Sequence, residues 1–377
     1  MKKKICRVCG KKLFDEAILQ FINMPKSAQF LPSAIEILTE IGVDVDIFQC
    51  SNCALVQLMS EPVPYYREVI RATALSEEMT DFRRGQFKQW IDDYFLQGNK
   101  LIEIGCGSGE FLNIMQENEV SVYGLEYGEE SVRKAINQGF RVENSFLAND
   151  TQLLKEAPFD AFYMLNFLEH LPDPNLTLKG IHNNLVDGAI GLVEVPNFDM
   201  IIRNNLFAEF ISDHLLYFTQ ETFISTLSSN GFEVLSCNEV WHDYSLSAVV
   251  KKREKTDLSS FIHTQKVLES EVNQYINRFC GGSVAIWGAG HQALAVMSLI
   301  ELKGKIKYVV DSAKFKQDKF TPATHIPIVS PSMLNDDPVK AIIVMAASYS
   351  DEVVKIIQAD YRDIDIAVLR ESGLEII

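Results

Sequence analysis

The chain has 377 residues, of which 47% are hydrophobic and 23% are charged, and its formal net charge is -16. This length predicts two or three domains, and this composition is that of an ordinary globular protein. Because so acidic a chain repels a phosphate backbone, DNA and RNA are excluded as expected partners. The sequence shows no apolar run of membrane-spanning length, and its basic first residues lead into cysteines and not into the apolar core of a signal peptide. We therefore expect a cytoplasmic protein with no membrane partner.

Four of the seven cysteines form two Cys-x-x-Cys pairs, Cys6 with Cys9 and Cys50 with Cys53. Two such pairs are typical of a zinc ribbon, in which four thiolates complete the tetrahedral coordination of a structural zinc ion. Disulfides are the weaker alternative in a reducing cytoplasm, and free or redox-active cysteines are another. We interpret residues 1–60 as a zinc-binding module.

Residues 61–98 open with two prolines and then show apolar residues at helical spacing. This pattern predicts a helical connector between the cysteine module and the region that follows.

A buried strand, a glycine turn and a helix start are predicted within residues 101–112, LIEIGCGSGEFL. The apolar run carries Glu103 and leads into three alternating glycines, Gly105, Gly107 and Gly109. Glycine lets the backbone bend tightly and approach a ligand, and the helix N-terminus presents free amides to it. The next strand ends in Glu126, 21 positions after Gly105, where an acid can accept the ribose hydroxyls of a nucleoside. The spacing G-x-G-x-G differs from the dinucleotide fingerprint G-x-G-x-x-G.

Strand-like runs alternate with helical segments through residues 99–255, which predicts an α/β domain whose largely parallel sheet is covered on both faces. These runs are 100–104, 121–126, 159–164, 190–196, 232–236 and 246–250.

A second α/β unit is predicted at residues 256–377, after a charged linker. Its first strand is followed by Gly288, Gly290 and Ala293, which satisfy the dinucleotide pattern, and Asp311 lies 23 residues past Gly288. A nicotinamide site in this unit is therefore an alternative to a cofactor site at the first glycine loop.

The first glycine loop resembles motif I of class I S-adenosylmethionine-dependent methyltransferases, and residues 158–174, PFDAFYMLNFLEHLPDP, resemble a later motif of the same superfamily. This resemblance implies a doubly wound core that binds S-adenosylmethionine. The implied cofactor residues are Glu103, the three glycines of the loop, Glu126 and Asn166. A nucleotide fold with an empty site is the alternative.

The order of two cysteine pairs, methyltransferase core and second α/β unit resembles the bacterial nucleotide-sugar C-methyltransferases over nearly the whole chain. The segments that carry the resemblance are Cys6 to Gly10, Cys50 to Gln57, Val309 to Asp311 and Thr321 to Ile328. It implies a C-terminal Rossmann-like domain that shapes the substrate site and binds no nicotinamide. It also implies a small-molecule nucleotide sugar as the substrate, and we expect a monomer more than an oligomer.

Members of that family carry a His-Glu-His-x-x-Tyr-Phe-like motif whose second histidine is the base. The matching stretch in this chain is Ser212-Asp213-His214-Leu215-Leu216-Tyr217-Phe218. The resemblance implies that His214 is the base and that His170 is a second active-site histidine. Asp213 replaces the family's glutamate, a departure that bears on the substrate more than on the reaction.

Methylation of a carbon beside a ketone requires a base that removes the α proton and a donor that stabilises the resulting enolate. Imidazole titrates near 6.5, so His214 can serve as the base, tuned by Asp213, while His170 donates to the oxygen and Tyr65 or Tyr66 closes the site. The plainer alternatives are a structural His214, a turn residue at His170 and two tyrosines that only pack.

We predict methyl transfer from S-adenosylmethionine to a carbon of a nucleotide-linked keto sugar. The alternatives are an O-methyltransferase acting on a sugar or related metabolite, and a non-catalytic binding protein that retains a methyltransferase fold.

Overall fold

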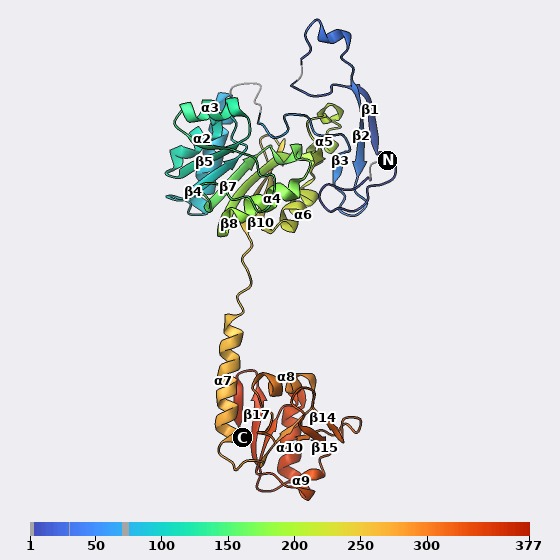
Figure 1. The fold of residues 1–377 in the computed structure, drawn as a ribbon, viewed down its shortest axis with the longest axis vertical. Helices are drawn as coiled ribbons and strands as arrows, with labels where there is room; N and C mark the ends of the chain where they lie inside the picture. The colour runs from blue at the N-terminus through green and yellow to red at the C-terminus, as the bar shows by residue number, and fades with distance from the viewer. Residues whose placement is uncertain (1–3, 30, 70–74) are drawn as a thin grey trace. The chain divides into compact units, whose positions relative to one another are not determined.

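The computed structural model describes residues 4–29, 31–69 and 75–377. The chain divides into two compact units, Met1–Glu254 and Lys255–Ile377, each built around its own sheets (Figure 1). The predicted finer division of the first unit at residues 60 and 98 stays an interpretation. Within the described ranges, no helix is both long and apolar enough to cross a membrane.

The cysteine module contributes three strands to a four-stranded sheet of order β1-β2-β3-β9. The strands are β1 (Leu19–Met24), β2 (Val43–Gln49), β3 (Val56–Leu58) and β9 (Leu216–Tyr217), and the loop between β1 and β2 carries the short helix η1 (Glu36–Leu38). The fourth strand, β9, comes from a much later part of the chain and pairs antiparallel with β3 through Val56 and Tyr217. The module is therefore joined to the segment that follows His214.

The large sheet of the first unit has seven strands in the order β10-β11-β8-β7-β4-β5-β6. The strands are β4 (Lys100–Ile104), β5 (Ser121–Glu126), β6 (Arg141–Asn144), β7 (Phe159–Leu165), β8 (Leu185–Pro196), β10 (Phe232–Val240) and β11 (Ser245–Lys252). The five strands from β8 to β6 run parallel, and β11 is inserted antiparallel between β8 and β10. The predicted class I methyltransferase sheet is confirmed, and the one strand that was not predicted, β6, is a polar edge strand.

Alternate residues of the central strands enter two separate apolar clusters, as expected for a sheet with both faces covered. Ile102 and Phe162 belong to one cluster, whereas Leu101 and Tyr163 belong to the other. The helices that cover the faces are α1 (Glu77–Asp93), α2 (Glu110–Met115), α3 (Glu129–Asn137), α4 (Pro174–Asn183), α5 (Phe198–Arg203) and α6 (Gln220–Ser229). The predicted connector helix corresponds to α1, whose first turn is capped by the Ser76 side chain.

The second unit is a Rossmann-like α/β domain with the strand order β14-β15-β13-β12-β16-β17-β18. Its strands are β12 (Val284–Trp287), β13 (Val309–Val310), β14 (Lys319–Phe320), β15 (Pro327–Val329), β16 (Ala341–Val344), β17 (Asp365–Arg370) and β18 (Gly373–Ile376). Its helices are α7 (Ser259–Ile276), α8 (His291–Leu299), α9 (Met333–Asp336) and α10 (Ser350–Asp360). The strands β15, β13, β12, β16 and β17 are parallel, and antiparallel strands close both edges.

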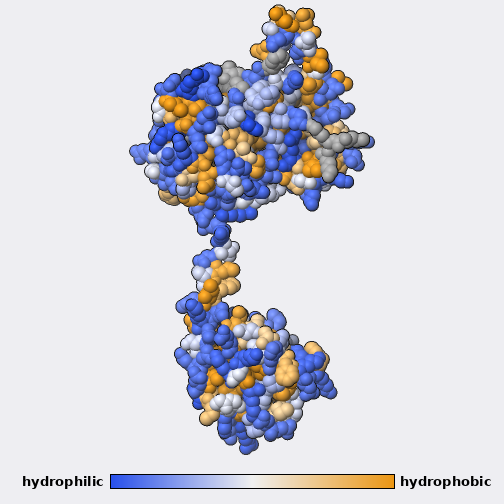
Figure 2. Space-filling model, viewed as in Figure 1, coloured by the Kyte–Doolittle hydropathy of each residue, from blue (hydrophilic) through white to orange (hydrophobic). Residues whose placement is uncertain are grey.

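Most of the surface in view is hydrophilic, but hydrophobic side chains gather on the loop around η1 (Figure 2). The exposed apolar residues of this loop are Leu31, Ile35, Ile37, Leu38 and Ile41.

Candidate active site

The glycine loop between β4 and α2 has the conformation that its sequence predicts. Gly105, Gly107 and Gly109 all have positive φ, at 76°, 56° and 95°, a region that side-chain-bearing residues rarely adopt. A Cβ atom at Gly105 would also lie 2.9 Å from Cγ2 of Val69 and 3.1 Å from the ring of Phe167. The loop therefore requires glycine both for its turn and for the close approach of neighbouring segments.

The buried acid Glu126 lies at the carboxyl end of β5, beside this loop. One carboxylate oxygen accepts a hydrogen bond from the amide of Gly107 at 3.0 Å, and the other accepts from the amide of Gly128 at 2.8 Å. Burial raises the pKa of Glu126, and these amide donors partly oppose that rise. Glu103 is also buried, within β4 and between the paired residues Gly124 and Tyr163 of the adjacent strands.

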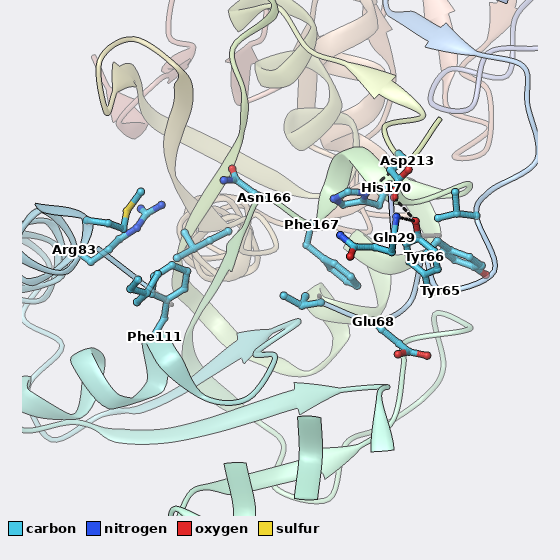
Figure 3. Close-up of a pocket in the computed structure, with 15 residues that line it drawn as sticks. Gln29, Tyr65, Tyr66, Glu68, Arg83, Phe111, Asn166, Phe167, His170 and Asp213 are labelled. Carbon is cyan, nitrogen blue, oxygen red and sulfur yellow. Dashed lines mark hydrogen bonds between the residues drawn. The ribbon is translucent and has the colours of Figure 1, made fainter. Parts of the chain in front are cut away.

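A cavity of about 260 Å³ opens near the ends of β4 and β7 (Figure 3). Figure 3 shows Arg83, Phe111 and Asn166 on one side of the cavity and the cluster of His170, Asp213, Tyr65 and Tyr66 on the other. Asn166 follows β7 with a positive φ of 50° and is exposed to solvent. The cavity thus brings the predicted cofactor residue Asn166 together with four of the predicted catalytic residues, His170, Asp213, Tyr65 and Tyr66.

The two predicted histidines lie against each other. The rings of His170 and His214 have centroids 4.8 Å apart and meet edge to face, and the His214 ring also approaches Tyr217. Nδ1 of His170 lies 2.9 Å from the carbonyl oxygen of Asp213. His170 and Asp213 line the cavity, whereas His214 reaches it only through its contact with His170.

Burial fixes the protonation states of this cluster. It lowers the pKa of His214 to about 3, with a further contribution from His170, and it also lowers the pKa of His170. Both imidazoles are therefore neutral near pH 7, the form that accepts a proton. Burial has the opposite effect on the neighbouring carboxyl and raises the pKa of Glu169 to about 8.

The carboxylate of Asp213 holds two other segments at the site. Oδ1 accepts a hydrogen bond from the hydroxyl of Tyr65 at 2.7 Å, and Oδ2 accepts from the amide of Ala28 at 2.8 Å. Asp213 therefore ties the connector and the cysteine module to the loop that carries His214. Tyr66 also lines the cavity, and its hydroxyl accepts a hydrogen bond from Nε of Arg67 at 2.9 Å.

The four predicted metal ligands converge. Sγ of Cys6 lies 3.6 Å from Sγ of Cys53, Sγ of Cys9 lies 3.4 Å from Sγ of Cys50, and all four sulfur atoms are within 4.8 Å of one another. A tetrahedral ion with metal–sulfur bonds of about 2.3 Å needs sulfur atoms about 3.8 Å apart, so the donor set fits one zinc ion. The amides of Asn52 and Cys53 point at Sγ of Cys50, at 3.4 Å each, and favour its thiolate form.

Asp311, the acid of the alternative nicotinamide site, forms hydrogen bonds within its own domain. The carboxylate of Asp311 accepts hydrogen bonds from the amides of Ala289 and Ala313, both at 2.9 Å, and from Nζ of Lys316 at 2.8 Å.

Sequence reasoning gave no role to two residues of the site. Arg83 lines the cavity and forms a buried ion pair with Glu194, with Nη1 2.6 Å from Oε2. No sequence pattern pointed to Arg83, because its partner lies more than 100 positions away. Glu169 is buried against the histidine pair, and its place beside His170 in the sequence is the signal that could have found it.

Comparisons with known proteins agree with this geometry. Residues 79–237 match a family model described as a methyltransferase domain, and residues 251–365 match one described as a C-methyltransferase C-terminal domain. The first match contains the glycine loop, Glu126 and the histidine pair. The chain is an S-adenosylmethionine-dependent methyltransferase.

Relatives of this methyltransferase include enzymes of two kinds. The C-methyltransferase NovU of Streptomyces niveus is 19% identical, over 93% of this chain and 91% of its own length. A ubiquinone biosynthesis O-methyltransferase of Pseudomonas aeruginosa (strain LESB58) is 28% identical, over 40% of this chain and 71% of its own length.

Among solved structures, the PH0226 protein of Pyrococcus horikoshii OT3 is similar, with a TM-score of 0.41 and 13% identity over 51% of this chain and 99% of its own. An S-adenosylmethionine-dependent methyltransferase of Clostridium acetobutylicum ATCC 824 has a TM-score of 0.40 and is 13% identical, over 50% of this chain and 96% of its own length.

Proposed function

We propose that this methyltransferase transfers a methyl group to a carbon atom of a nucleotide-linked keto sugar, next to the ketone. The observation that carries the proposal is the contact of His214 with His170, which lines the same cavity as Phe111 and the predicted cofactor residue Asn166. The match of residues 251–365 to a C-methyltransferase C-terminal domain and the full-length similarity to NovU support carbon as the acceptor.

In this proposal the residues of the glycine loop and Glu126 hold S-adenosylmethionine, which supplies an electrophilic methyl group when bound. Glu126 suits this role because its carboxylate already faces the loop and can accept hydrogen bonds from ribose hydroxyls. Glu103 and Asn166 complete the proposed cofactor residues, and the four cysteines hold a structural zinc ion.

We assign the proton transfer to His214. As the base, His214 takes the α proton of the substrate and leaves an enolate as the carbon nucleophile. Burial lowers the pKa of His214 to about 3, below the range that suits a base at neutral pH, so the assignment is based on the contact of the ring with His170 and not on its pKa. The proposal requires the acceptor carbon to reach the edge of the cavity where the His214 ring meets His170.

The hydrogen bonding of His170 changes its expected role. Its Nδ1 faces the carbonyl oxygen of Asp213, which can only accept, so Nδ1 carries the hydrogen. In the neutral ring no second N–H remains for the enolate oxygen. We therefore propose His170 as a positioning residue that holds the Asp213–His214 loop, and Tyr65 as a second positioning residue that acts through Asp213.

Solvent exchange tests the role of His214 separately from methyl transfer. Wild-type protein in deuterated water should exchange the α hydrogen of a nucleotide 4-keto sugar, and His214→Gln should lower turnover by about 10²–10⁴-fold, the usual effect of removing a general base. His242→Gln is the matched control, because this exposed histidine lies outside the cavity. Unchanged exchange in His214→Gln, with cofactor binding intact, would refute the assignment.

The second candidate is methyl transfer to oxygen, favoured by the similarity to ubiquinone biosynthesis O-methyltransferases over 40% of the chain. In that case His214 would take a hydroxyl proton, and no carbon-bound hydrogen would exchange with solvent.

A further inference from the structure

Three metal-binding side chains meet at the histidine pair, apart from the four cysteines. A carboxylate oxygen of Glu169 and one ring nitrogen each from His170 and His214 lie within 4.8 Å of one another. Glu169 and His170 belong to the 3-10 helix η3 (Leu168–His170), and the amide of Leu215 donates to the carbonyl oxygen of Glu169 at 2.8 Å. This backbone bond fixes the loop of His214 against η3.

The hydrogen bonding of the His170 ring leaves a lone pair on the nitrogen nearer Glu169. Nδ1 donates its hydrogen to the carbonyl of Asp213, so in the neutral ring Nε2 is unprotonated, and it lies 3.8 Å from Oε1 of Glu169. Metal-binding histidines usually have this arrangement, with one nitrogen on the metal and the other donating to a carbonyl or carboxylate.

The spacing between these two atoms fits a bridging ion. Hydrogen bonds from nitrogen to oxygen span about 2.7–3.2 Å, so 3.8 Å is too long for one. Two metal–ligand bonds of about 2.1 Å each reach about 4.2 Å, so an ion between Nε2 and Oε1 can bond to both.

The second oxygen of Glu169 provides independent support. The Glu169 side chain is 1% exposed, and its Oε2 has no hydrogen-bond partner in the described parts of the chain. Buried polar atoms without a partner are rare, because leaving water without a replacement interaction is costly. A cation bound by this carboxylate would supply the missing interaction.

We propose that Glu169, His170 and His214 form a second metal site that binds a divalent transition ion such as Zn²⁺ or Co²⁺. Two imidazoles and one carboxylate are a donor set that these ions accept, with a position left open, whereas Mg²⁺ prefers oxygen ligands. The ion would bind the ring nitrogen of His214 through the lone pair that otherwise accepts a proton. Provided that His214 is the base of the proposed function, filling the site inhibits proton abstraction.

Metal stoichiometry tests the site without reference to activity. Full-length protein loaded with Co²⁺ and dialysed should hold about two ions per chain, one at the cysteines and one at the three-residue site. Both His214→Ala and Glu169→Gln should hold about one, and His263→Ala, which removes an exposed histidine of α7, should still hold two. The visible spectrum should lose the weaker bands of nitrogen- and oxygen-bound Co²⁺ in the first two variants and keep the thiolate bands.

A single ion per wild-type chain, or a second ion retained by both His214→Ala and Glu169→Gln, would overturn the site. Activity separates this inference from the proposed function. If the second ion binds and α-hydrogen exchange rises, the site stands and His214 is not the base. If exchange depends on His214 but no second ion binds, the metal site fails and the proposed function stands.

Discussion

Burial shifts the pKa values of Glu169 and His214, which both lie beside His170, in opposite directions. It lowers the pKa of His214 to about 3 and raises the pKa of Glu169 to about 8, so near pH 7 the imidazole is neutral and the carboxyl holds its proton. A charged group is therefore absent from both positions at neutral pH. Falling pH therefore destabilises the folded protein through His214, and rising pH destabilises it through Glu169.

We predict that the unfolding free energy of the wild type falls below pH 6.5 relative to that of His214→Gln. In this range the unfolded histidine, with a pKa near 6.5, binds a proton that the folded one does not, so acid favours unfolding. Between pH 6.5 and 5.5 the difference should change by about 1 kcal/mol. Urea denaturation at constant zinc measures it.

The same titration in Glu169→Gln should show the opposite sign. Between about pH 4.5 and pH 8 the folded Glu169 holds a proton that the unfolded one releases, so the wild type loses stability relative to the variant as pH rises. Parallel pH curves for the wild type and either variant would contradict the neutral forms of His214 and Glu169.

Cofactor affinity should depend on Glu126. Glu126→Ala should weaken S-adenosylmethionine binding by about 1–3 kcal/mol, the cost of losing charged hydrogen bonds to ribose hydroxyls. Calorimetry gives this value, and Glu130→Ala, an exposed acid on α3, is the charge-matched control. Equal affinity in Glu126→Ala and the wild type would place the ribose elsewhere.

At the scale of elements, the antiparallel pairing of β3 with β9 connects the cysteine module to the segment that follows His214. Val56 and Gln57 of β3 pair with Tyr217 and Leu216 of β9, which begins two residues after His214. Further contacts join the module to the core, since Nη1 of Arg7 donates to the carbonyl of Pro172 at 3.1 Å. The zinc ion proposed for the cysteines would thus stabilise the position of the loop that carries His214.

We therefore expect Cys50→Ser to lower the yield of folded protein and to reduce the zinc content by about one ion per chain, because three cysteines and a hydroxyl hold zinc poorly. Cys280→Ser, at an exposed cysteine of the second unit, should change neither. Elemental analysis and circular dichroism are the measurements. A Cys50→Ser protein with full zinc content and wild-type folding would exclude these cysteines as the metal site.

The sequence allowed the central strands to be predicted because their apolar runs and glycine turn reflect burial and backbone geometry directly. It did not reveal β6, whose residues Arg141–Asn144 are mostly polar at an open edge, or β9, whose two residues pair with a strand about 160 positions earlier. The sequence motifs predicted that His170 and His214 belong to the active site. The protonation of Glu169 depends on its burial in the folded protein, which its neighbours in the sequence do not reveal.

At the scale of the whole molecule, the chain carries two Rossmann-like sheets, each with a glycine turn that leads into a helix and an acid at the end of the next strand. A backbone amide of each turn donates to that acid, from Gly107 to Glu126 and from Ala289 to Asp311, and Asp311 also forms an ion pair with Lys316. Residues 251–365, most of the second unit, match a family model described as a C-methyltransferase C-terminal domain.

Transfer of a labelled methyl group tests the central claim most directly. The protein is incubated with S-adenosylmethionine that carries a CD₃ group and with nucleotide-linked 4-keto sugars, and the product is characterised by mass spectrometry and NMR. We predict a sugar in which CD₃ replaces a hydrogen on the carbon next to the ketone. A CD₃ group attached to oxygen would contradict carbon methylation. A sugar recovered with no CD₃ group on any carbon next to the ketone would contradict it as well.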